Sequence, residues 1–300
     1  MTCVGFGKII LLGEHAVVYG YPALAAALDR GVTVAPVPTP AGGPLRLDLR
    51  GWDLAVTAGD PHPVARSLAA IADALDLGRP PVSLIGDAQL PPGAGLGSSA
   101  ALAVAVARAL LTYARRPIDA ATLTRAAGAS EALVHGKPSG VDVALAIAGG
   151  IGVFRRATGL VALGNVPPLR VLVGPSGAPR STAAMIDRVA EATGSLVDDA
   201  RLRELGGLTD AGTAALLAGE LPALGAAMDR AHALLGDLGV STPQLDALCE
   251  AARAAGAHGA KLTGAGGGGA VIAIAARDRE QAVLAAWKRA SVAGFVATVR

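Results

Sequence analysis

The 300-residue chain is 52% hydrophobic and 17% charged, with a formal net charge of +2. This composition excludes a disordered protein and permits a sizeable buried core. The arginines are scattered and aromatic residues make up only 3% of the chain, so the basic, aromatic-rich surface of a nucleic-acid-binding protein is not predicted.

The sequence shows no sign of secretion or membrane insertion. Cys3 and Cys249 form neither a CxxC pair nor a disulfide framework. The start of the chain lacks a charged-then-apolar leader, and no apolar run reaches the roughly 18 residues of a membrane span. We therefore expect a soluble protein with no membrane partner, in a reducing, cytoplasmic setting.

Apolar runs and alternation predict strands, and 3.6-residue periodicity predicts helices. In chain order, strands are expected at 4–12, 32–37, 45–49 and 82–85, a hairpin at 152–163, and strands at 169–173, 260–262, 270–275 and 295–299. Helices are expected at 61–77, 98–114 and 119–135, several between 182 and 255, and one at 277–290. The helix at 98–114 is apolar on nearly every face, which indicates deep burial.

The Pro167–Pro168 pair marks a break in the chain. We place a domain boundary there, with an N-terminal domain at 1–166 and a C-terminal domain at 167–300. Antiparallel returns and segregated helices favour an α+β fold over a doubly wound sheet.

The strongest motif is PPGAGLGSSAA, which starts at Pro91 and leads into the helix at 98–114. Glycines at alternate positions let the backbone turn sharply and present N–H groups, and a helix start adds positive dipole. Ser99 adds a hydroxyl that can bind Mg²⁺. The motif predicts a triphosphate site. The alternative is a plain helix start at which Ser98 acts as the N-cap.

Two known phosphate motifs were compared with this loop. The Walker pattern is absent, because no lysine follows the glycines. The dinucleotide pattern GxGxxA matches 95–100. However, the second strand with an acidic residue about 20 positions further on is missing, which argues against a nicotinamide-dependent dehydrogenase.

Three further segments carry candidate site residues. Lys8 lies in the first predicted strand and Glu14–His15 follow its end. A lysine beside a phosphate site neutralises transferring charge, although a solvent-exposed lysine is the simpler interpretation. Five glycines within 264–269 exceed the needs of a hairpin and suggest close approach to a ligand or another loop, the alternative being a flexible surface turn.

The third segment runs from Ser130 to Gly150. Glu131 falls toward the end of its helix, and Ser139 opens a new helix with Asp142 three residues later. The S-x-x-D spacing is also that of a capping box, so a structural role for both residues is the alternative. An acidic side chain at a helix start could orient a substrate hydroxyl.

These segments, in this order, resemble the GHMP kinase superfamily. GEHAVVYG and HGKPSGVD are similar to the mevalonate kinase family within it, and the resemblance runs from Lys8 to about Gly269. It implies an N-terminal domain like ribosomal protein S5 domain 2 and a ferredoxin-like C-terminal domain. The family often has Ala-Pro where this chain has Gly5–Phe6, which we expect to alter only the strand entry.

The resemblance assigns roles residue by residue. Asp142 matches the catalytic aspartate and Lys8 the lysine that pairs with it and approaches the phosphates. Glu131 and Ser99 match the Mg²⁺ ligands. Expected ATP-binding residues are Lys8, Pro92, Gly93, Ala94, Gly95, Leu96, Gly97, Ser98 and Ser99; expected substrate-binding residues are His15, Ser139, Asp142 and Thr182; Gly264, Gly266 and Gly267 are expected near the ligand. For adenine, the region around Trp52 is a candidate.

The implied reaction is ATP- and Mg²⁺-dependent phosphorylation of the C5 hydroxyl of (R)-mevalonate, in the mevalonate pathway of isoprenoid biosynthesis. The family is often dimeric, so a homodimer is expected. The alternatives are phosphomevalonate kinase, diphosphomevalonate decarboxylase or homoserine kinase within the superfamily. A nucleotide-binding regulator is disfavoured, because Lys8, Glu131 and Asp142 are all present.

Overall fold

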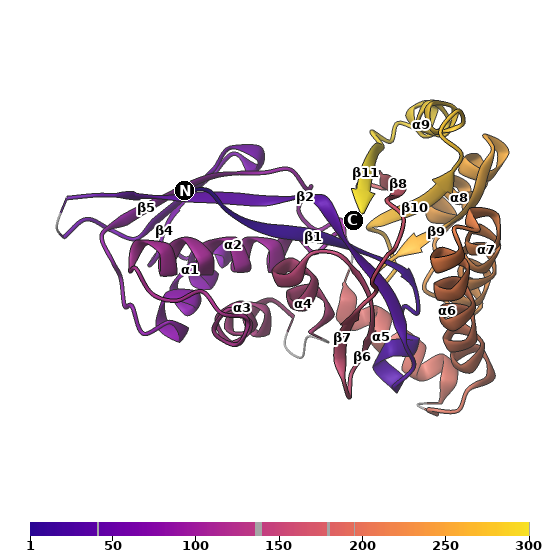
Figure 1. The fold of residues 1–300 in the computed structure, drawn as a ribbon, viewed down its shortest axis with the longest axis horizontal. Helices are drawn as coiled ribbons and strands as arrows, with labels where there is room; N and C mark the ends of the chain where they lie inside the picture. The colour runs from indigo at the N-terminus through magenta and orange to yellow at the C-terminus, as the bar shows by residue number, and fades with distance from the viewer. Residues whose placement is uncertain (41, 136–139, 179–180, 195, 300) are drawn as a thin grey trace. The chain divides into compact units, whose positions relative to one another are not determined.

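The structure is a computed structural model that describes residues 1–40, 42–135, 140–178, 181–194 and 196–299, without the side chain of residue 135 (Figure 1). The chain forms two compact units. Unit 1 comprises Met1–Gly7, Arg30–Pro92 and Gly97–Gly149; unit 2 comprises Lys8–Asp29, Gly93–Leu96 and Gly150–Arg300. The long strands β1 (Cys3–Leu12) and β2 (Ala23–Pro38) contribute residues to both units.

Unit 1 is built on strands in the order β4-β3-β5-β2. The short strands β3 (Arg46–Leu49) and β4 (Leu54–Thr57) pair antiparallel and are joined by the 3₁₀ turn η2 (Arg50–Trp52). Strand β5 (Val82–Ala88) pairs parallel with β3 and antiparallel with β2, with Val32 opposite Ala88. The strands therefore form a mixed sheet.

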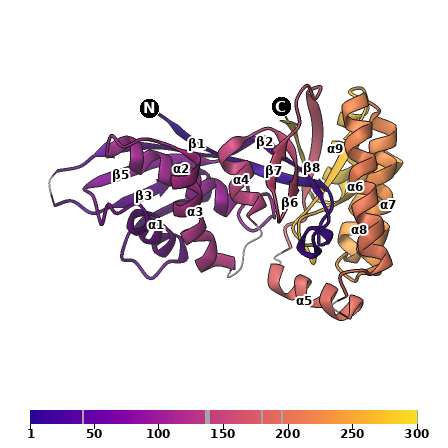
Figure 2. The ribbon, with the colours of Figure 1, turned by 60° about the horizontal axis from the view of Figure 1, so that its bottom comes forward.

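Four helices lie on one face of these strands (Figure 2): α1 (Pro63–Ala74), α2 (Ser98–Tyr113), α3 (Ala120–His135) and α4 (Val141–Ala148). Helix α2 is central. It contacts α1, α3 and α4, and every residue from Ala100 to Ala107 is buried. Its Ala, Leu and Val side chains meet apolar neighbours on nearly all sides, which confirms the burial predicted from its composition.

A glycine allows β1 to approach this helix. A Cβ atom on Gly5 would lie 1.9 Å from the carbonyl oxygen of Ala101, so any larger residue would push α2 away. In this chain, the close packing of the first strand on α2 thus explains the glycine of the Gly5–Phe6 pair.

In unit 2, strand β2 continues the strand order into β6 (Ile151–Arg155) and β7 (Gly159–Ala162). Both pairings are antiparallel, with Ala23 opposite Phe154 and Gly152 opposite Ala162, so the predicted hairpin is confirmed. The 3₁₀ turn η1 (Ala16–Tyr19) connects β1 to β2.

A second sheet in unit 2 is fully antiparallel, in the order β11-β8-β10-β9. Its strands are β8 (Leu169–Pro175), β9 (Ala257–Thr263), β10 (Ala270–Ala275) and β11 (Phe295–Val299). Strand β9 lies at one edge and leads into the glycine-rich segment 264–269.

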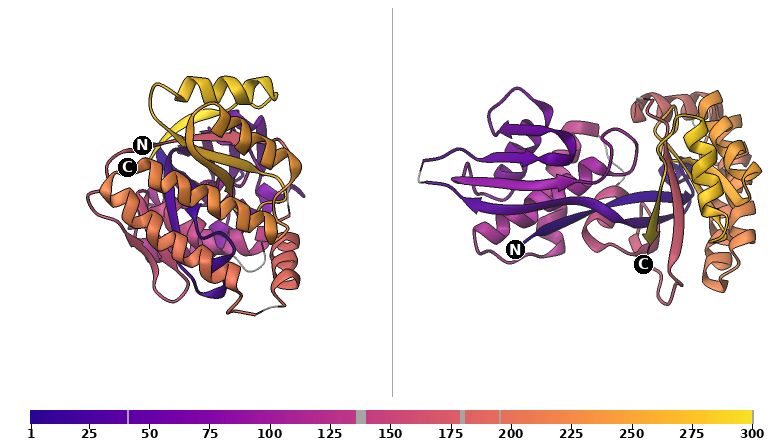
Figure 3. Two further views of the ribbon diagram at one scale, coloured as in Figure 1. Left: turned by 90° about the vertical axis from the view of Figure 1, so that its right-hand side faces the viewer. Right: turned by 90° about the horizontal axis from the view of Figure 1, so that it is seen from above.

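Five helices complete unit 2: α5 (Thr182–Thr193), α6 (Ala200–Ala218), α7 (Leu221–Asp237), α8 (Pro243–Ala254) and α9 (Glu280–Arg289). Helices α7 and α8 pack against β9 and β10, α9 packs against β8 and α8, and α6 packs on α7 (Figure 3). Helices and antiparallel strands segregate in this way in α+β proteins, as predicted.

The main differences from the predicted elements concern β2 and two helix starts. Strand β2 begins at Ala23, nine residues before the predicted strand, and the predicted helix at 61–77 begins at Pro63, where the side chain of His62 accepts a hydrogen bond from Val64 N. Helix α4 begins at Val141 with Gly140 at its N-cap, not at Ser139. The predicted domain boundary near Val166 stays a prediction.

In the part of the chain that the structure describes, no helix combines the length and the apolar character that a membrane crossing requires.

Candidate active site

The loop before α2 uses the conformational freedom of glycine. Gly93, Gly95 and Gly97 have φ of 72°, 79° and 70°, in the left-handed region that costs other residues about 1–2 kcal/mol. Gly97 is the N-cap of α2, and no side chain caps the helix. The predicted alternative, in which Ser98 is the N-cap, is wrong because Ser98 is the first helical residue. A helix start without a side-chain cap suits an anion.

Lys8 lies next to this loop in unit 2. Its backbone N–H donates to the carbonyl of Leu96 at 2.8 Å, which ties β1 to the loop residues Gly93–Leu96. The side chain of Lys8 is only 3% exposed. The simpler interpretation of Lys8 as a solvent-exposed lysine is therefore wrong.

Three candidate residues of unit 1 lie on helices that pack against one another. Ser99 is in the first turn of α2, Glu131 is near the end of α3, and Asp142 is in the first turn of α4. Glu131 is 1% exposed, whereas Ser99 and Asp142 are half-buried. A buried carboxylate is unusual in proteins, because its ionised form requires a charged or polar partner.

The donor types on these helices fit Mg²⁺. One hydroxyl and one carboxylate are hard oxygen ligands, and Mg²⁺ normally takes its other ligands from phosphates and water. Among the residues that the structure describes, no three His, Cys, Asp or Glu side chains gather into a metal site.

The capping-box alternative for Ser139 and Asp142 cannot be followed at Ser139, which lies outside the described residues. Because Gly140 is the N-cap of α4, Asp142 is the second residue of the helix. Near the region proposed for adenine, Trp52 is partly buried against the core of unit 1, and its Nε1 donates to the carbonyl of Leu90 at 2.8 Å.

The turn Glu14–His15 in unit 2 is held in an unusual conformation. His15 has φ 58° and ψ −48°, a combination rarely adopted by residues other than glycine. Its Nε2 lies 2.8 Å from the carbonyl oxygen of Ala265, in the glycine-rich segment. The fold thus brings together two motifs that are 250 residues apart in the chain.

Glu14 and Lys261 form an ion pair that the sequence analysis did not predict. Their side chains are 1% and 0% exposed, and Lys261 Nζ also donates to the carbonyl of Leu262 at 2.6 Å. Glu14 stands in GEHAVVYG and Lys261 stands three residues before the glycine-rich segment 264–269, but their long separation in the chain hides the pairing. The signal available in the sequence was a charged residue at the edge of an apolar, glycine-rich segment.

The glycine-rich segment 264–269 is packed and is not a flexible surface turn. A Cβ atom on Gly266 would lie 2.1 Å from the carbonyl oxygen of Val240, and one on Gly267 would lie 2.7 Å from the sulfur of Met185. Gly267 N also donates to Val240 O at 2.8 Å. Close approach to the α7–α8 connection and to helix α5 therefore accounts for these two glycines.

The contact with Met185 places the start of α5 beside this segment. Thr182 is the first residue of α5 and is half-buried. Because residues three apart share a helix face, Thr182 lies on the same side of α5 as Met185. Within unit 2, His15 and Met185 of α5 thus both lie against the segment 264–269.

The strand topology argues against the dinucleotide-binding alternative. A dinucleotide fold follows its glycine loop with a helix and a parallel strand. Here α2 is followed by the helices α3 and α4, and the strand before the loop, β5, pairs antiparallel with β2.

Family models match both halves of the chain. The model described as GHMP kinases N terminal domain matches residues 63–150, and the model described as GHMP kinases C terminal matches residues 213–293. The first match contains the glycine loop, Glu131 and Asp142, and the second contains the segment 264–269. The chain belongs to the GHMP kinase family.

Its relatives narrow this class to mevalonate kinases. A mevalonate kinase of Aeropyrum pernix is 33% identical over 310 residues, covering 98% of this chain and 94% of that relative. One of Mus musculus is 31% identical and covers 95% and 88%. The crystal structure of L. major mevalonate kinase in complex with R-mevalonate has a TM-score of 0.88 at 26% identity, covering 100% of this chain and 96% of that one.

Proposed function

We propose that this protein is a mevalonate kinase, which transfers the γ-phosphoryl group of ATP to the C5 hydroxyl of (R)-mevalonate. The products are 5-phosphomevalonate and ADP. The observation that carries the proposal is one-third identity to a mevalonate kinase over nearly the whole length of both chains. A local motif match could come from any GHMP kinase, whereas this identity extends over 98% of the chain.

The nucleotide is assigned to the glycine loop. The backbone N–H groups of Gly93–Ser98 and the start of α2 hold the phosphates, with Pro92 at the loop entrance. The left-handed glycines and the missing side-chain cap support this assignment. Ser99 and Glu131 would hold Mg²⁺, which would offset the negative charge of the phosphates.

The chemical step is assigned to Lys8 and Asp142. Phosphoryl transfer depends on positioning and charge stabilisation more than on covalent help. Lys8 stabilises the charge of the transferring group. Burial of the lysine strengthens this interaction, because the local dielectric constant is low. Asp142 accepts the proton of the C5 hydroxyl or orients that hydroxyl for attack.

His15, Ser139 and Thr182 are assigned to the mevalonate side, and Gly264, Gly266 and Gly267 to the wall beside it. The contact of His15 with Ala265 and the position of α5 beside Gly267 support this assignment for the described residues. A cytoplasmic location and a homodimer complete the proposal.

A substrate panel tests the function. Release of ADP is measured with ATP, Mg²⁺ and, one at a time, (R)-mevalonate, phosphomevalonate, diphosphomevalonate and homoserine. We expect kcat/KM for mevalonate to exceed that for each other compound by at least about 100-fold, because a misplaced phosphate or amine leaves buried groups unpaired. A higher value for phosphomevalonate or homoserine would assign the chain to that activity instead.

A further inference from the structure

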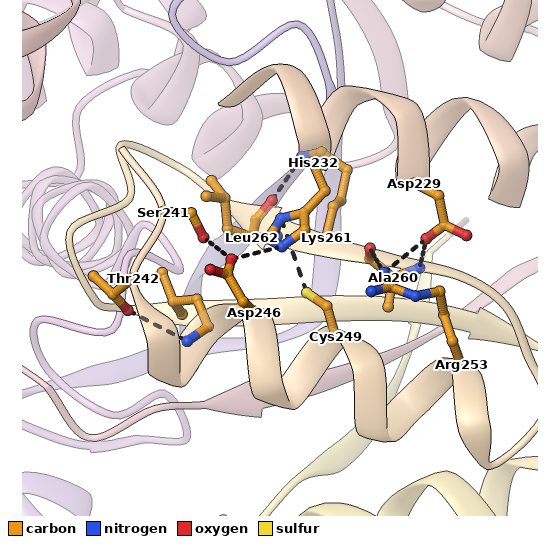
Figure 4. A network of polar contacts seen from close by, with 11 residues as sticks. Asp229, His232, Ser241, Thr242, Asp246, Cys249, Arg253, Ala260, Lys261 and Leu262 are labelled. Carbon is orange, nitrogen blue, oxygen red and sulfur yellow. Dashed lines mark hydrogen bonds and ion pairs between the residues drawn. The ribbon is translucent and has the colours of Figure 1, made fainter. Parts of the chain in front are cut away.

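Strand β9 is an edge strand whose outer hydrogen-bond donors are satisfied by side chains. The backbone N–H of Ala260 donates to Asp229 Oδ1 at 2.8 Å, and that of Leu262 donates to His232 Nδ1 at 3.3 Å (Figure 4). Asp229 and His232 are three residues apart on α7 and so share one face of that helix. Side chains of α7 therefore accept hydrogen bonds along the open edge of the sheet, and these bonds fix the position of β9 relative to the helix.

Strand β9 and the segment after it also contact the end of β1 and the Glu14–His15 turn. Lys261 Nζ donates to Glu14. Thr263 Oγ1 accepts from Ile10 N at 2.9 Å and donates to Ile10 O at 3.0 Å. The carbonyl of Ala265 contacts His15 Nε2. Residues 261 and 263 point to one face of the strand because side chains alternate, whereas the contact of Ala265 comes from the backbone of the segment that follows β9.

The ion pair in this row is not arranged for stability alone. Burial raises the pKa of Glu14 and lowers the pKa of Lys261, so each charge is held against its desolvation cost. Within the described part of the chain, Glu14 Oε2 has no hydrogen-bond partner. Buried pairs can often be replaced by neutral residues of similar size without loss of stability. The retained charges therefore call for a role other than stability.

The unusual backbone conformation of the neighbouring residue His15 indicates what this role is. The positive-φ conformation of His15 costs about 1–3 kcal/mol and persists only where its surroundings impose it. Glu14 is the residue directly before it. A carboxylate held in place by a rigid cation on β9 restrains the turn on one side, and the contact with Ala265 restrains it on the other.

We propose that Lys261 is a positioning residue, which holds the Glu14 carboxylate and thereby sets His15 against the glycine-rich segment 264–269 for binding of the alcohol substrate. This inference rests on the proposed function for the identity of that substrate. It differs from a purely structural role, in which the pair would support folding and leave substrate binding unchanged.

Nearby polar groups do not offer a competing chemical role. Cys249 Sγ lies 4.0 Å from His232 Nδ1, and His232 Nε2 lies 3.1 Å from Asp246 Oδ1 (Figure 4). This order resembles a nucleophile, base and acid. However, burial raises the pKa of the Cys249 thiol to about 12, which keeps it protonated and unreactive at neutral pH.

The test compares Lys261→Met with the double variant Glu14→Gln/Lys261→Met. The single variant leaves a buried carboxylate unpaired and is expected to lose stability, whereas the double variant removes both charges and keeps the volumes similar. Lys288→Met is the control, because it makes the same substitution at an exposed lysine on α9. Thermal unfolding of all three variants is measured first.

We expect the double variant to fold and its kcat/KM for mevalonate to be at least about 30-fold lower than that of wild type. Most of this loss should come from a higher KM for mevalonate, while KM for ATP stays within about twofold. This pattern is that of a lost binding interaction specific to one substrate. Wild-type values are expected for Lys288→Met. A folded double variant with kcat/KM within about threefold of wild type overturns the proposal. Failure of the double variant to fold assigns the pair to stability and also overturns it.

A second measurement does not depend on the substrate. Hydrogen exchange of amides 13–17 and 264–269, and the ¹⁵N signals of the His15 ring, are recorded without ligands. We expect faster exchange in both segments and a changed His15 signal in the double variant alone. If wild type does not phosphorylate mevalonate, the proposed function fails while this measurement still decides the positioning role. Unchanged exchange and an unchanged His15 signal contradict it.

Discussion

His232 Nδ1 accepts a hydrogen bond from the backbone N–H of Leu262 at 3.3 Å, so the imidazole ring completes the edge of β9. Accepting at Nδ1 requires that this nitrogen carry no proton, which places the proton of the neutral ring on Nε2, 3.1 Å from Asp246 Oδ1. Burial lowers the pKa of His232 from its ordinary value of 6.5, consistent with a neutral ring.

This relationship predicts a pH-dependent stability. Since the folded-state pKa of His232 lies below the unfolded value, the unfolded chain binds more protons as the pH falls. The contribution of His232 is therefore fully present above pH 6.5 and is lost progressively below it. We expect His232→Phe to lower the free energy of unfolding by about 1–3 kcal/mol at pH 7.5, because it leaves a buried N–H unpaired.

The measurement is urea unfolding of both proteins between pH 7.5 and 5. The difference in the free energy of unfolding between wild type and His232→Phe should become smaller toward pH 5. His258→Phe, at a half-buried position on the same strand, is the comparison. A gap for His232→Phe that stays constant or widens on acidification would contradict the assignment.

Asp142→Asn should remove turnover and keep ATP binding. The amide is nearly isosteric but cannot accept the hydroxyl proton, and general-base catalysis contributes about 100- to 10,000-fold. We expect kcat to fall at least about 100-fold while the dissociation constant for ATP, from calorimetry, stays within about threefold. Activity within about tenfold of wild type would remove Asp142 from the chemistry.

Glu131→Gln should raise the Mg²⁺ concentration needed for half-maximal activity. Removing one anionic oxygen from a site with few protein ligands weakens metal binding, and we expect a shift of about tenfold. Glu250→Gln is the matched control, since Glu250 is exposed on α8. The assignment of Glu131 is wrong if the two variants give the same metal titration.

Gly93→Ala should weaken ATP binding without unfolding the protein. Gly93 has φ 72° and a Cβ atom there would meet nothing within 4 Å, so alanine adds backbone strain alone. The strain of about 1–2 kcal/mol can be relieved by moving the loop, which would misplace its N–H groups. We expect KM for ATP to rise about three- to tenfold.

Gly219→Ala is the control for this change, because Gly219 has φ 73° and equally open surroundings at the end of α6. It should lose a similar amount of stability and leave KM for ATP unchanged. An equal rise in KM for both variants would trace the effect to general destabilisation.

Local pattern was enough to locate most elements. Strands β10 and β11 have the bounds that alternation and β-branched residues predict, because those signals are local. The first part of β2 was missed. Its residues Ala23–Leu28 are all buried and rich in alanine, so neither alternation nor β-propensity marks them. Pairing with β6 makes this segment a strand.

The glycine loop could be recognised in the sequence because its requirements are local: left-handed turns at alternate positions, followed by a helix start. The burial of Lys8 could not, since a lysine in a strand is normally solvated and only the packing around β1 keeps water away.

The sequence by itself determined the fold class, the glycine-rich loop before α2 and the family, since each depends on residue types at short spacings. Only the tertiary structure decided that Glu14 meets Lys261 across 247 residues and that α7 closes the edge of β9. The physical reason is that the burial of a charge and the pairing of an edge N–H depend on which distant segments pack together, and no local pattern encodes that choice.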